Sequence, residues 1–497
     1  MQFFPKLKLI HWLAILSFVV FYLALTLTNL TSLPIFVDEA IYLRWSQIAW
    51  KDASWRFISL TDGKQPLYTW AVIPFFKIFD DPLFAGRATS VFFGLFTLLG
   101  IGYTGWLLKG KNLAFWSMFA ALISPFLFFY NRFAVMEGTL LAFCVWIFAF
   151  AILLAKTNRL DVAMILGIVT GLGLLVKSTA LFYFLLIPSA YLLVVNWKKI
   201  LTKDLFRFVG LVLIAWGIAQ VIYNIQRLSP WMHVIKDKNA FFIVPYSEIF
   251  KDPSRLLNNF LDIWRWHGAY TTLPLLLIGL FGLLSWVKKS PRPAILTASW
   301  FFLPLLGTVL LARLFSTRYM SFATPFLELL IGYGFVAVTS HKKRILLALI
   351  SSLLPLFLIG KLIYDPIHFP YVKVDEGYVN GWSAGNGTKQ IAQWAKDRLK
   401  ANPNIDKLTI YTEGTFGILP HGLELYTQGL PKLEIIGIYP INDIPPAQVI
   451  QNARANKETY LILNNTEIEG VPPGLELIAS YEKLRVNSMR LYRVVPR

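Results

Sequence analysis

Residues 9–40 read LIHWLAILSFVVFYLALTLTNLTSLPIFVDEA, an apolar run that ends shortly before two adjacent carboxylates, Asp38 and Glu39. The run from 9 to 29 is long enough to cross a bilayer, since a membrane helix needs about 20 apolar residues. It lacks a small-residue cleavage site, so we expect an uncleaved anchor. The two carboxylates then lie at the water interface on the far side, beside a bilayer that penalises charges buried more deeply.

The composition of the whole chain is that of a polytopic membrane protein. Of its 497 residues, 56% are hydrophobic and only 15% are charged, which excludes a water-soluble surface over most of the chain. The formal net charge of +19 falls largely in short basic clusters between apolar runs, as membrane topology requires, so we expect no nucleic-acid partner. The single cysteine, Cys144, allows no intramolecular disulfide.

Apolar runs before residue 364 predict a membrane all-α fold, a bundle of about 11 transmembrane helices. Their expected limits are 9–29, 85–108, 113–130, 134–155, 162–177, 179–196, 207–225, 271–287, 294–312, 319–339 and 344–363. Basic clusters such as Lys342 with Lys343 occupy alternate connections, which the positive-inside rule makes cytoplasmic. We therefore predict a multi-pass protein of the cell membrane, with a cytoplasmic amino terminus.

A change of composition near residue 364 predicts two domains, a transmembrane domain at 1–363 and an extracytoplasmic soluble α/β domain at 364–497. In the second domain, segments 408–411 and 460–463 predict strands, and the apolar spacing over 383–399 predicts a helix. In the first outer loop, we expect residues 40–50 and 66–79 to form helices that lie at the membrane interface. The soluble part shows no metal-ligand spacing and no Gly-rich phosphate loop.

Charged residues on the outer side, or at the outer ends of spans, are few. They include Asp38, Glu39, Lys64, Arg87, Arg132, Glu137, Lys177, Arg313 and Arg318. The predicted topology brings most of them to the depth of the outer headgroups, although they are far apart in the sequence. Carboxylates together with Lys and Arg at this depth suit a phosphate-bearing lipid headgroup attacked under general base catalysis, because cations stabilise the phosphate while a carboxylate accepts a proton.

Several of these residues also have a simpler structural explanation. A helix cap would explain Asp38 alone. An exposed loop position would explain Lys64, and a salt bridge between spans would explain Arg132 and Glu137. Lys177 could extend toward the lipid headgroups without any further function, as Lys side chains at the ends of spans commonly do. These explanations account poorly for the occurrence of all the charges at one depth.

Three of the segments that carry these charges resemble motifs of the polytopic glycosyltransferases of the C superfold, in particular the branch of protein O-mannosyltransferases and lipid A aminoarabinose transferases. Val37-Asp38-Glu39-Ala40 resembles the acidic pair of the first outer loop in that family. Residues 63–68, GKQPLY, resemble its basic segment ending in Pro-Pro-Leu, with Gln65 replacing the first proline. Residues 131–137, NRFAVME, are similar to its segment in which Arg is followed five positions later by Asp, here replaced by Glu137.

Two more segments extend the resemblance, which covers roughly residues 9–340. Residues 171–177, GLGLLVK, resemble the family's Gly-Leu-x-x-Leu-x-Lys signature, and residues 316–319, STRY, resemble its Arg-Tyr signature. The Trp-Trp-Asp signature of oligosaccharyltransferases is absent from the sequence, which argues against that branch.

The resemblance implies a polyprenyl-phosphate-sugar donor, inversion at the anomeric carbon, and an acceptor hydroxyl on a protein, lipid or glycan. It identifies Asp38 as the catalytic base, and Glu39 would orient Asp38 or the acceptor. Lys64 and Arg318 would hold the leaving phosphate. The other charged candidates for binding or supporting the substrate are Arg132, Glu137 and Lys177. No cofactor or metal is expected to be required, although some relatives bind a divalent metal.

Two other classes of protein fit parts of the pattern. A polytopic secondary transporter would also bury charges among its spans, but at the middle of the bilayer and usually between two related halves. A structural membrane assembly protein would need no catalytic base. Loss of sugar transfer in Asp38→Asn would favour the enzyme, whereas solute flux in vesicles without a lipid donor would favour the transporter.

Overall fold

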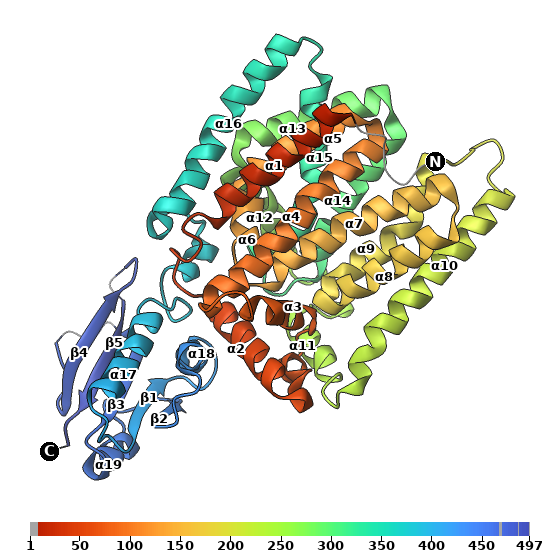
Figure 1. Cartoon of the computed structure of the whole chain (residues 1–497). Helices are drawn as coiled ribbons and strands as arrows, with labels where there is room; N and C mark the ends of the chain where they lie inside the picture. Colours follow the sequence, from red (N-terminus) through yellow and green to blue (C-terminus); the bar gives the residue numbers. More distant parts are fainter. Residues whose placement is uncertain (1–7, 467–469, 486, 497) are drawn as a thin grey trace. The chain divides into compact units, whose positions relative to one another are not determined.

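The computed structural model describes residues 8–466, 470–485 and 487–496 (Figure 1). The chain divides into two compact units, and each is described by itself. The bundle unit comprises Met1–Thr28, Arg56–Ala71 and Arg87–Ile363, and the sheet unit comprises Asn29–Trp55, Val72–Gly86 and Tyr364–Arg497. The acidic pair, in the loop after the first helix, therefore belongs to the sheet unit, whereas Lys64 belongs to the bundle unit.

Long apolar helices make up most of the bundle unit. They are α1 (Leu9–Leu27), α4 (Pro82–Lys109, its first turn in the sheet unit), α5 (Lys111–Leu122), α6 (Pro125–Asn131), α7 (Met136–Thr157), α8 (Leu160–Val176), α9 (Leu181–Leu186), α10 (Lys203–Tyr223), α11 (Val234–Phe242), α12 (Pro253–His267), α13 (Leu273–Lys289), α14 (Pro291–Leu311), α15 (Thr324–Ala337) and α16 (His341–Tyr364).

Among the described residues, eight helices are long and apolar enough to cross a membrane, and the pair α5 and α6, bent by 68°, would make a ninth. The expected spans at 162–177 and 179–196 are present as shorter apolar helices, Leu160–Val176 and Ser178–Leu193. One long helix, Pro253–Lys289, begins well before the expected span at 271–287. Each expected span thus corresponds to a helical segment, which confirms the predicted all-α membrane fold. Eight or nine of the described segments, rather than about 11, are long and apolar enough to cross a membrane by themselves.

Helices α13 and α15 of the bundle unit pack closely against one another. A Cβ on Gly282 of α13 would lie 2.2 Å from the carbonyl oxygen of Leu330, and one on Gly334 of α15 would lie 2.2 Å from that of Ile278. Only glycine permits this approach, the usual way in which membrane helices pack without a hydrophobic driving force between them. Beside it, the rings of Trp286 and Tyr333 stack with centroids 4.5 Å apart.

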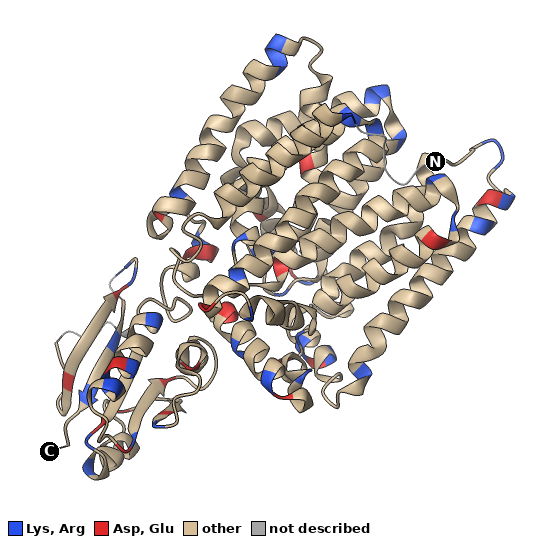
Figure 2. Cartoon of the chain, in the orientation of Figure 1, with Lys and Arg blue, Asp and Glu red and all other residues tan. Residues whose placement is uncertain are grey.

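Basic side chains lie at helix ends of the bundle unit, and Figure 2 shows few of them along the lengths of the helices. The Lys109 ammonium at the end of α4 lies 5.4 Å from the ring of Tyr333 at the end of α15. Arg344 at the start of α16 lies 6.0 Å from the ring of Trp116 in α5. The predicted cytoplasmic connections after α4 and α15 therefore meet at the same end of the bundle.

The sheet unit contains a five-stranded mixed sheet with strand order β2-β1-β3-β5-β4. Its strands are β1 (Leu408–Glu413), β2 (Leu433–Ile438), β3 (Thr459–Thr466), β4 (Leu475–Glu482) and β5 (Ser488–Val494), and its helices include α2 (Val37–Lys51), α17 (Thr388–Ala401), α18 (Leu423–Thr427) and α19 (Ala447–Ala455). Helix α3 (Leu67–Phe76) begins in the bundle unit and ends in the sheet unit. β1 is parallel to both neighbours, and β5 is antiparallel to β3 and β4. This is the α/β architecture predicted for the carboxyl-terminal region.

Helices cover both faces of this sheet, because strand side chains alternate between them. On one face, Tyr411 and Leu461 pack with Val449 of α19 in a buried cluster. On the other, Trp394 of α17 meets Tyr460 edge to face, with ring centroids 4.7 Å apart. Coverage of both faces explains why β1 and β3 are buried at consecutive positions, 408–412 and 459–464.

Candidate active site

The acidic pair lies in the first turn of α2 in the sheet unit. The backbone N–H of Phe36, the residue at the cap position, donates to Oε2 of Glu39 at 3.0 Å, and Glu39 is fully buried. Asp38 is only partly buried. Both carboxylates are favoured here by the positive end of the helix dipole. The capping role considered for Asp38 is therefore performed by Glu39, and Asp38 lies beside it at the start of the helix.

The segment before α2 is fixed by backbone pairing with another part of the sheet unit. The N–H of Val37 donates to the carbonyl of Ser383 at 3.0 Å, and the N–H of Gly385 donates to that of Ile35 at 2.8 Å. A short antiparallel bridge joins Phe36 and Ala384. Because these bonds constrain the backbone immediately before Asp38, they also constrain where α2 begins.

In the bundle unit, one buried carboxylate is paired with two cations. Oε1 of Glu137 lies 2.6 Å from Nζ of Lys177. The guanidinium of Arg318 donates from Nε to Oε1 at 3.2 Å and from Nη2 to Oε2 at 3.3 Å. The Glu137 side chain is 1% exposed, whereas those of Lys177 and Arg318 are 21% and 15% exposed. In this group, which we call the Glu137 cluster, the carboxylate is buried and the parts that remain accessible belong to the cations.

Three chain segments meet at this cluster. Glu137 is in the first turn of α7, and Lys177 is the extended residue that ends α8. Arg318 lies in the short 3-10 helix Thr317–Tyr319, where the Thr317 hydroxyl lies 2.7 Å from that of Tyr130 in α6. The start of α7 and the end of α8 are at the same end of the bundle because these two helices are antiparallel neighbours.

Lys64 lies in the neighbourhood of the Glu137 cluster. Its ammonium is 5.6 Å from the ring of Phe242, which contacts the ring of Tyr319 at 6.4 Å; the Tyr319 ring in turn lies 5.0 Å from the ammonium of Lys177. The adjacent Gln65 donates to the hydroxyl of Ser178 at 2.6 Å. Aromatic side chains thus connect the surroundings of Lys64 with those of Lys177 and Arg318.

The turn that presents Lys64 depends on the glycine before it. Gly63 has φ of +66°, and a Cβ there would lie 2.8 Å from the carbonyl oxygen of Val234. A side chain at this position would therefore be both strained and obstructed. Ion pairing between Asp62 and Lys238 at 2.5 Å holds the same turn against α11.

Arg132 lies in a separate group with Arg87. Its Nη2 donates to the carbonyl of Thr28 at 2.7 Å, and its guanidinium lies 4.9 Å from the ring of Phe128. Burial and the nearby charge of Arg87 lower the pKa of Arg132, although an arginine remains protonated at neutral pH. The predicted alternative of an Arg132–Glu137 salt bridge is wrong, because Glu137 pairs with Lys177 and Arg318.

Sequence reasoning found the members of the Glu137 cluster but not their pairing. It also missed Phe242 and Tyr319 as the aromatic contacts of Lys64 and Lys177. Tyr319 follows Arg318 directly and was visible in the Arg-Tyr signature; no sequence signal points to Phe242. Among the described residues, no group of three or more His, Cys, Asp or Glu side chains is placed to hold a metal ion.

At the level of fold, the chain is similar to solved membrane glycosyltransferases of the GT-C type, which agrees with the resemblance seen in the sequence. Residues 63–223 match the model of the dolichyl-phosphate-mannose-protein mannosyltransferase family, a segment that holds Lys64, Arg132, Glu137 and Lys177. No curated protein matches the chain in a search by sequence.

Similar solved structures extend over nearly the whole chain. ArnT from Cupriavidus metallidurans bound to undecaprenyl phosphate aligns with a TM-score of 0.59 at 15% identity, covering 97% of this chain and 98% of that one. The apo oligosaccharyltransferase of Archaeoglobus fulgidus aligns with a TM-score of 0.52 at 11% identity, and the alignment covers 91% of this chain and 69% of that one. The oligosaccharyltransferase AglB from Archaeoglobus fulgidus, in complex with an inhibitory peptide and a dolichol-phosphate, aligns with a TM-score of 0.50 at 11% identity. This alignment covers 92% of this chain and 69% of that one.

Asp38 and Glu39 belong to the sheet unit, whereas the Glu137 cluster and Lys64 belong to the bundle unit. That the two sets share one pocket stays a prediction, as do the catalytic and phosphate-binding roles of the individual residues.

Proposed function

We propose that the protein is an inverting glycosyltransferase that moves a sugar from a polyprenyl-phosphate donor to an acceptor hydroxyl at the extracytoplasmic face of the membrane. The observation that carries the proposal is the Glu137 cluster, in which two cations share one buried carboxylate and keep their accessible surface. Partly exposed Lys and Arg side chains that lie next to one another are groups that bind a phosphate through charge-assisted hydrogen bonds. ArnT and AglB were solved with undecaprenyl phosphate and dolichol-phosphate, which supports a lipid phosphate as the ligand.

In the proposed reaction, the acceptor oxygen attacks the anomeric carbon of the donor while Asp38 accepts the hydroxyl proton. A new bond forms between the acceptor oxygen and C1, the bond between C1 and the phosphate oxygen breaks, and the polyprenyl phosphate leaves with the bonding electrons. One displacement inverts the configuration at C1. Lys64, Lys177 and Arg318 stabilise the charge that develops on the leaving phosphate.

Glu137 and Glu39 have supporting roles in this proposal. Glu137 fixes the positions of Lys177 and Arg318, so that both cations are oriented before the donor binds. Glu39, which accepts from the N–H of Phe36, fixes the first turn of α2 and hence the position of Asp38. Arg132, held by the carbonyl of Thr28, supports the surrounding loops.

The test is sugar transfer by membranes that contain Asp38→Asn, supplied with polyprenyl-phosphate sugars and the native membrane fraction as acceptor. We expect a loss of at least about a hundredfold, the usual contribution of a positioned general base. Glu434→Gln is the matched control for the loss of one carboxylate, because Glu434 lies on strand β2 and forms an exposed ion pair with Lys407. This variant should keep full activity. Full transfer by Asp38→Asn would exclude Asp38 as the base.

We also propose that Lys and Arg, rather than a metal ion, supply the countercharge for the leaving phosphate. The same assay in excess EDTA is then expected to give the full rate. Loss of transfer in EDTA, with recovery on addition of Mg²⁺ or Mn²⁺, would contradict this part of the proposal without affecting the role of Asp38.

A further inference from the structure

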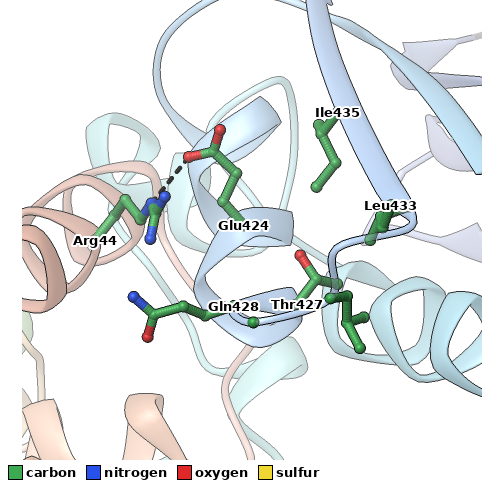
Figure 3. A pocket seen from close by; sticks show the side chains of 8 residues that line it. Arg44, Glu424, Thr427, Gln428, Leu433 and Ile435 are labelled. Atoms are coloured by element: carbon green, nitrogen blue, oxygen red, sulfur yellow. Dashed lines mark hydrogen bonds and ion pairs between the residues drawn. The ribbon is translucent and has the colours of Figure 1, made fainter.

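The sheet unit contains an open pocket of about 260 Å³ that the proposed reaction does not use. Helix α2 contributes Arg44, the segment 424–430 contributes most of the polar lining, and strand β2 contributes Leu433 and Ile435 (Figure 3). Arg44 is six positions after Asp38 on α2, which places it about 9 Å further along the helix axis. The pocket is thus distinct from the position of the acidic pair.

The two charges of the pocket neutralise one another. Nε of Arg44 lies 3.0 Å from Oε2 of Glu424, as the dashed line in Figure 3 marks, and their side chains are 20% and 30% exposed. Arg44 also donates to Oε1 of Gln47 at 3.4 Å, and Gln47 donates to the carbonyl of Leu425 at 3.0 Å. Because the pair has no net charge and is held in place, the pocket favours neither an anion nor a cation.

Hydrogen-bonding capacity nevertheless remains at the pocket. A guanidinium has five N–H donors, and two of those of Arg44 are used within the described part of the chain. Glu424 accepts through Oε2, which leaves Oε1 for a ligand hydroxyl. The amide of the exposed Gln428 offers a further donor and acceptor. Leu430, Leu433 and Ile435 provide an aliphatic surface beside these polar groups.

We infer that this pocket binds a single neutral sugar residue. A sugar ring carries vicinal hydroxyls that donate and accept at once, and it has C–H surfaces that pack on aliphatic side chains. The paired guanidinium and carboxylate, the amide and the leucine and isoleucine side chains match both properties. The volume of about 260 Å³ lies just below the range of about 300–1,000 Å³ for small-molecule sites, which suits one sugar ring.

The inference goes beyond the proposed function, because binding requires neither the lipid donor nor transfer. It is tested with the intact protein in detergent by saturation-transfer difference NMR. The probes are methyl α-D-mannopyranoside, methyl β-D-glucopyranoside, glucosamine and glucuronate. We expect at least one neutral glycoside to receive saturation from the protein and to bind more tightly than the charged sugars.

Variants identify the pocket as the source of the signal. Glu424→Gln and Gln428→Ala are expected to weaken binding about tenfold, since hydrogen bonds to the sugar are lost, and Gln428→Trp should abolish it by filling the pocket. Glu434→Gln, whose carboxylate pairs with Lys407 at 2.8 Å outside the pocket, is the matched control and should bind as the wild type does. Gln428→Ala leaves the ion pair intact, so its result does not depend on the stability of Glu424→Gln.

Three outcomes would overturn the inference. They are the absence of saturation transfer to every neutral glycoside, a preference for glucuronate or glucosamine, and unchanged binding in both Glu424→Gln and Gln428→Trp. None of them bears on the transfer assay with Asp38→Asn, so failure of this inference is distinguishable from failure of the proposed function.

Discussion

The backbone N–H of Val37 donates a 3.0 Å hydrogen bond to the carbonyl oxygen of Ser383, which ties the residue before Asp38 to the carboxyl-terminal region. Further along α2, Gln47 donates to the carbonyl of Leu425 at 3.0 Å. The helix that bears the proposed base is therefore held at its start and near its end by residues beyond 364. The carboxyl-terminal region thus fixes the position of α2, and with it the position of the proposed base.

Gly385→Ala tests this positioning role. A Cβ at residue 385 would lie 2.7 Å from the carbonyl oxygen of Ile35 and 2.6 Å from its Cγ2, so the segment 35–37 must shift. We expect turnover to fall roughly ten- to a hundredfold, as small misplacements of a catalytic group commonly cause, while KM for the lipid donor changes little. Gly360→Ala, where a Cβ meets nothing within 4 Å, is the matched control. Unchanged turnover in Gly385→Ala would show that this anchoring is unimportant.

The stability of the Glu137 cluster provides a second prediction. Glu137→Gln removes the carboxylate that pairs with both Lys177 and Arg318. Breaking a buried ion pair costs about 3–5 kcal/mol, and the cost is smaller here because both cations are partly exposed to solvent. We expect a clear fall in the thermal unfolding temperature. Arg318→Gln should be tolerated better in Glu137→Gln than in the wild type, with a coupling energy above about 1 kcal/mol in a double-mutant cycle. Additive effects of the two substitutions would contradict the pairing.

The sequence predicted the helices well because apolar runs determine which segments can cross a membrane. It failed where charge interrupts such a run: Arg255, Asp262 and Arg265 hide α12 from a hydropathy window, yet the helix continues from Pro253 to Lys289. A π-helical turn, Gly268–Thr272, connects α12 to α13, and its last residue has φ of +75°. Arg255 holds the start of α12 against the end of α14 by donating to the carbonyls of Leu310 and Ala312.

The candidate site was predictable as a set of residues but not as a set of contacts. Signatures identified Glu137, Lys177 and Arg318 individually, because each lies near a helix end at the same expected depth. Their ion pairs join segments distant in the chain, and single-sequence spacing carries no information about such contacts. The capping by Glu39 was likewise hidden, since an acidic dipeptide before a helix does not show which carboxylate turns back to the N–H of Phe36.

Membrane orientation gives a third prediction. Basic residues in the first turn of α16 should be cytoplasmic, and residues beyond 364 should be outside. The native Cys144 is buried, so single cysteines at exposed positions report their own accessibility. We expect Lys400→Cys to react with a membrane-impermeant maleimide in intact cells, and Lys343→Cys to react only after permeabilisation. The reverse pattern would place the sheet unit in the cytoplasm and contradict the proposed extracytoplasmic reaction.

An ion pair in the sheet unit gives a pH-dependent prediction. Arg398 donates to both carboxylate oxygens of Glu458, from Nη2 at 2.7 Å and from Nε at 3.1 Å, and the Tyr460 hydroxyl donates to the same carboxylate at 2.8 Å. The hydrogen bonds from Arg398, and next that from Tyr460, lower the pKa of Glu458 below its ordinary value of 4.5, while burial acts in the opposite direction. The folded protein therefore binds this proton less readily than the unfolded chain does.

The interaction accordingly stabilises the folded state above pH 4.5, and its contribution is lost as the pH falls through the lowered pKa. Glu458→Gln should reduce the free energy of unfolding at pH 7 by about 1 kcal/mol, the upper range for a partly exposed pair. Thermal unfolding of wild type and variant should differ clearly at pH 7 and progressively less below pH 4.5. Glu434→Gln, at the more exposed pair with Lys407, should show a smaller difference at pH 7. An equal loss in Glu458→Gln at pH 7 and well below pH 4.5 would mean that Glu458 contributes through packing rather than through its charge.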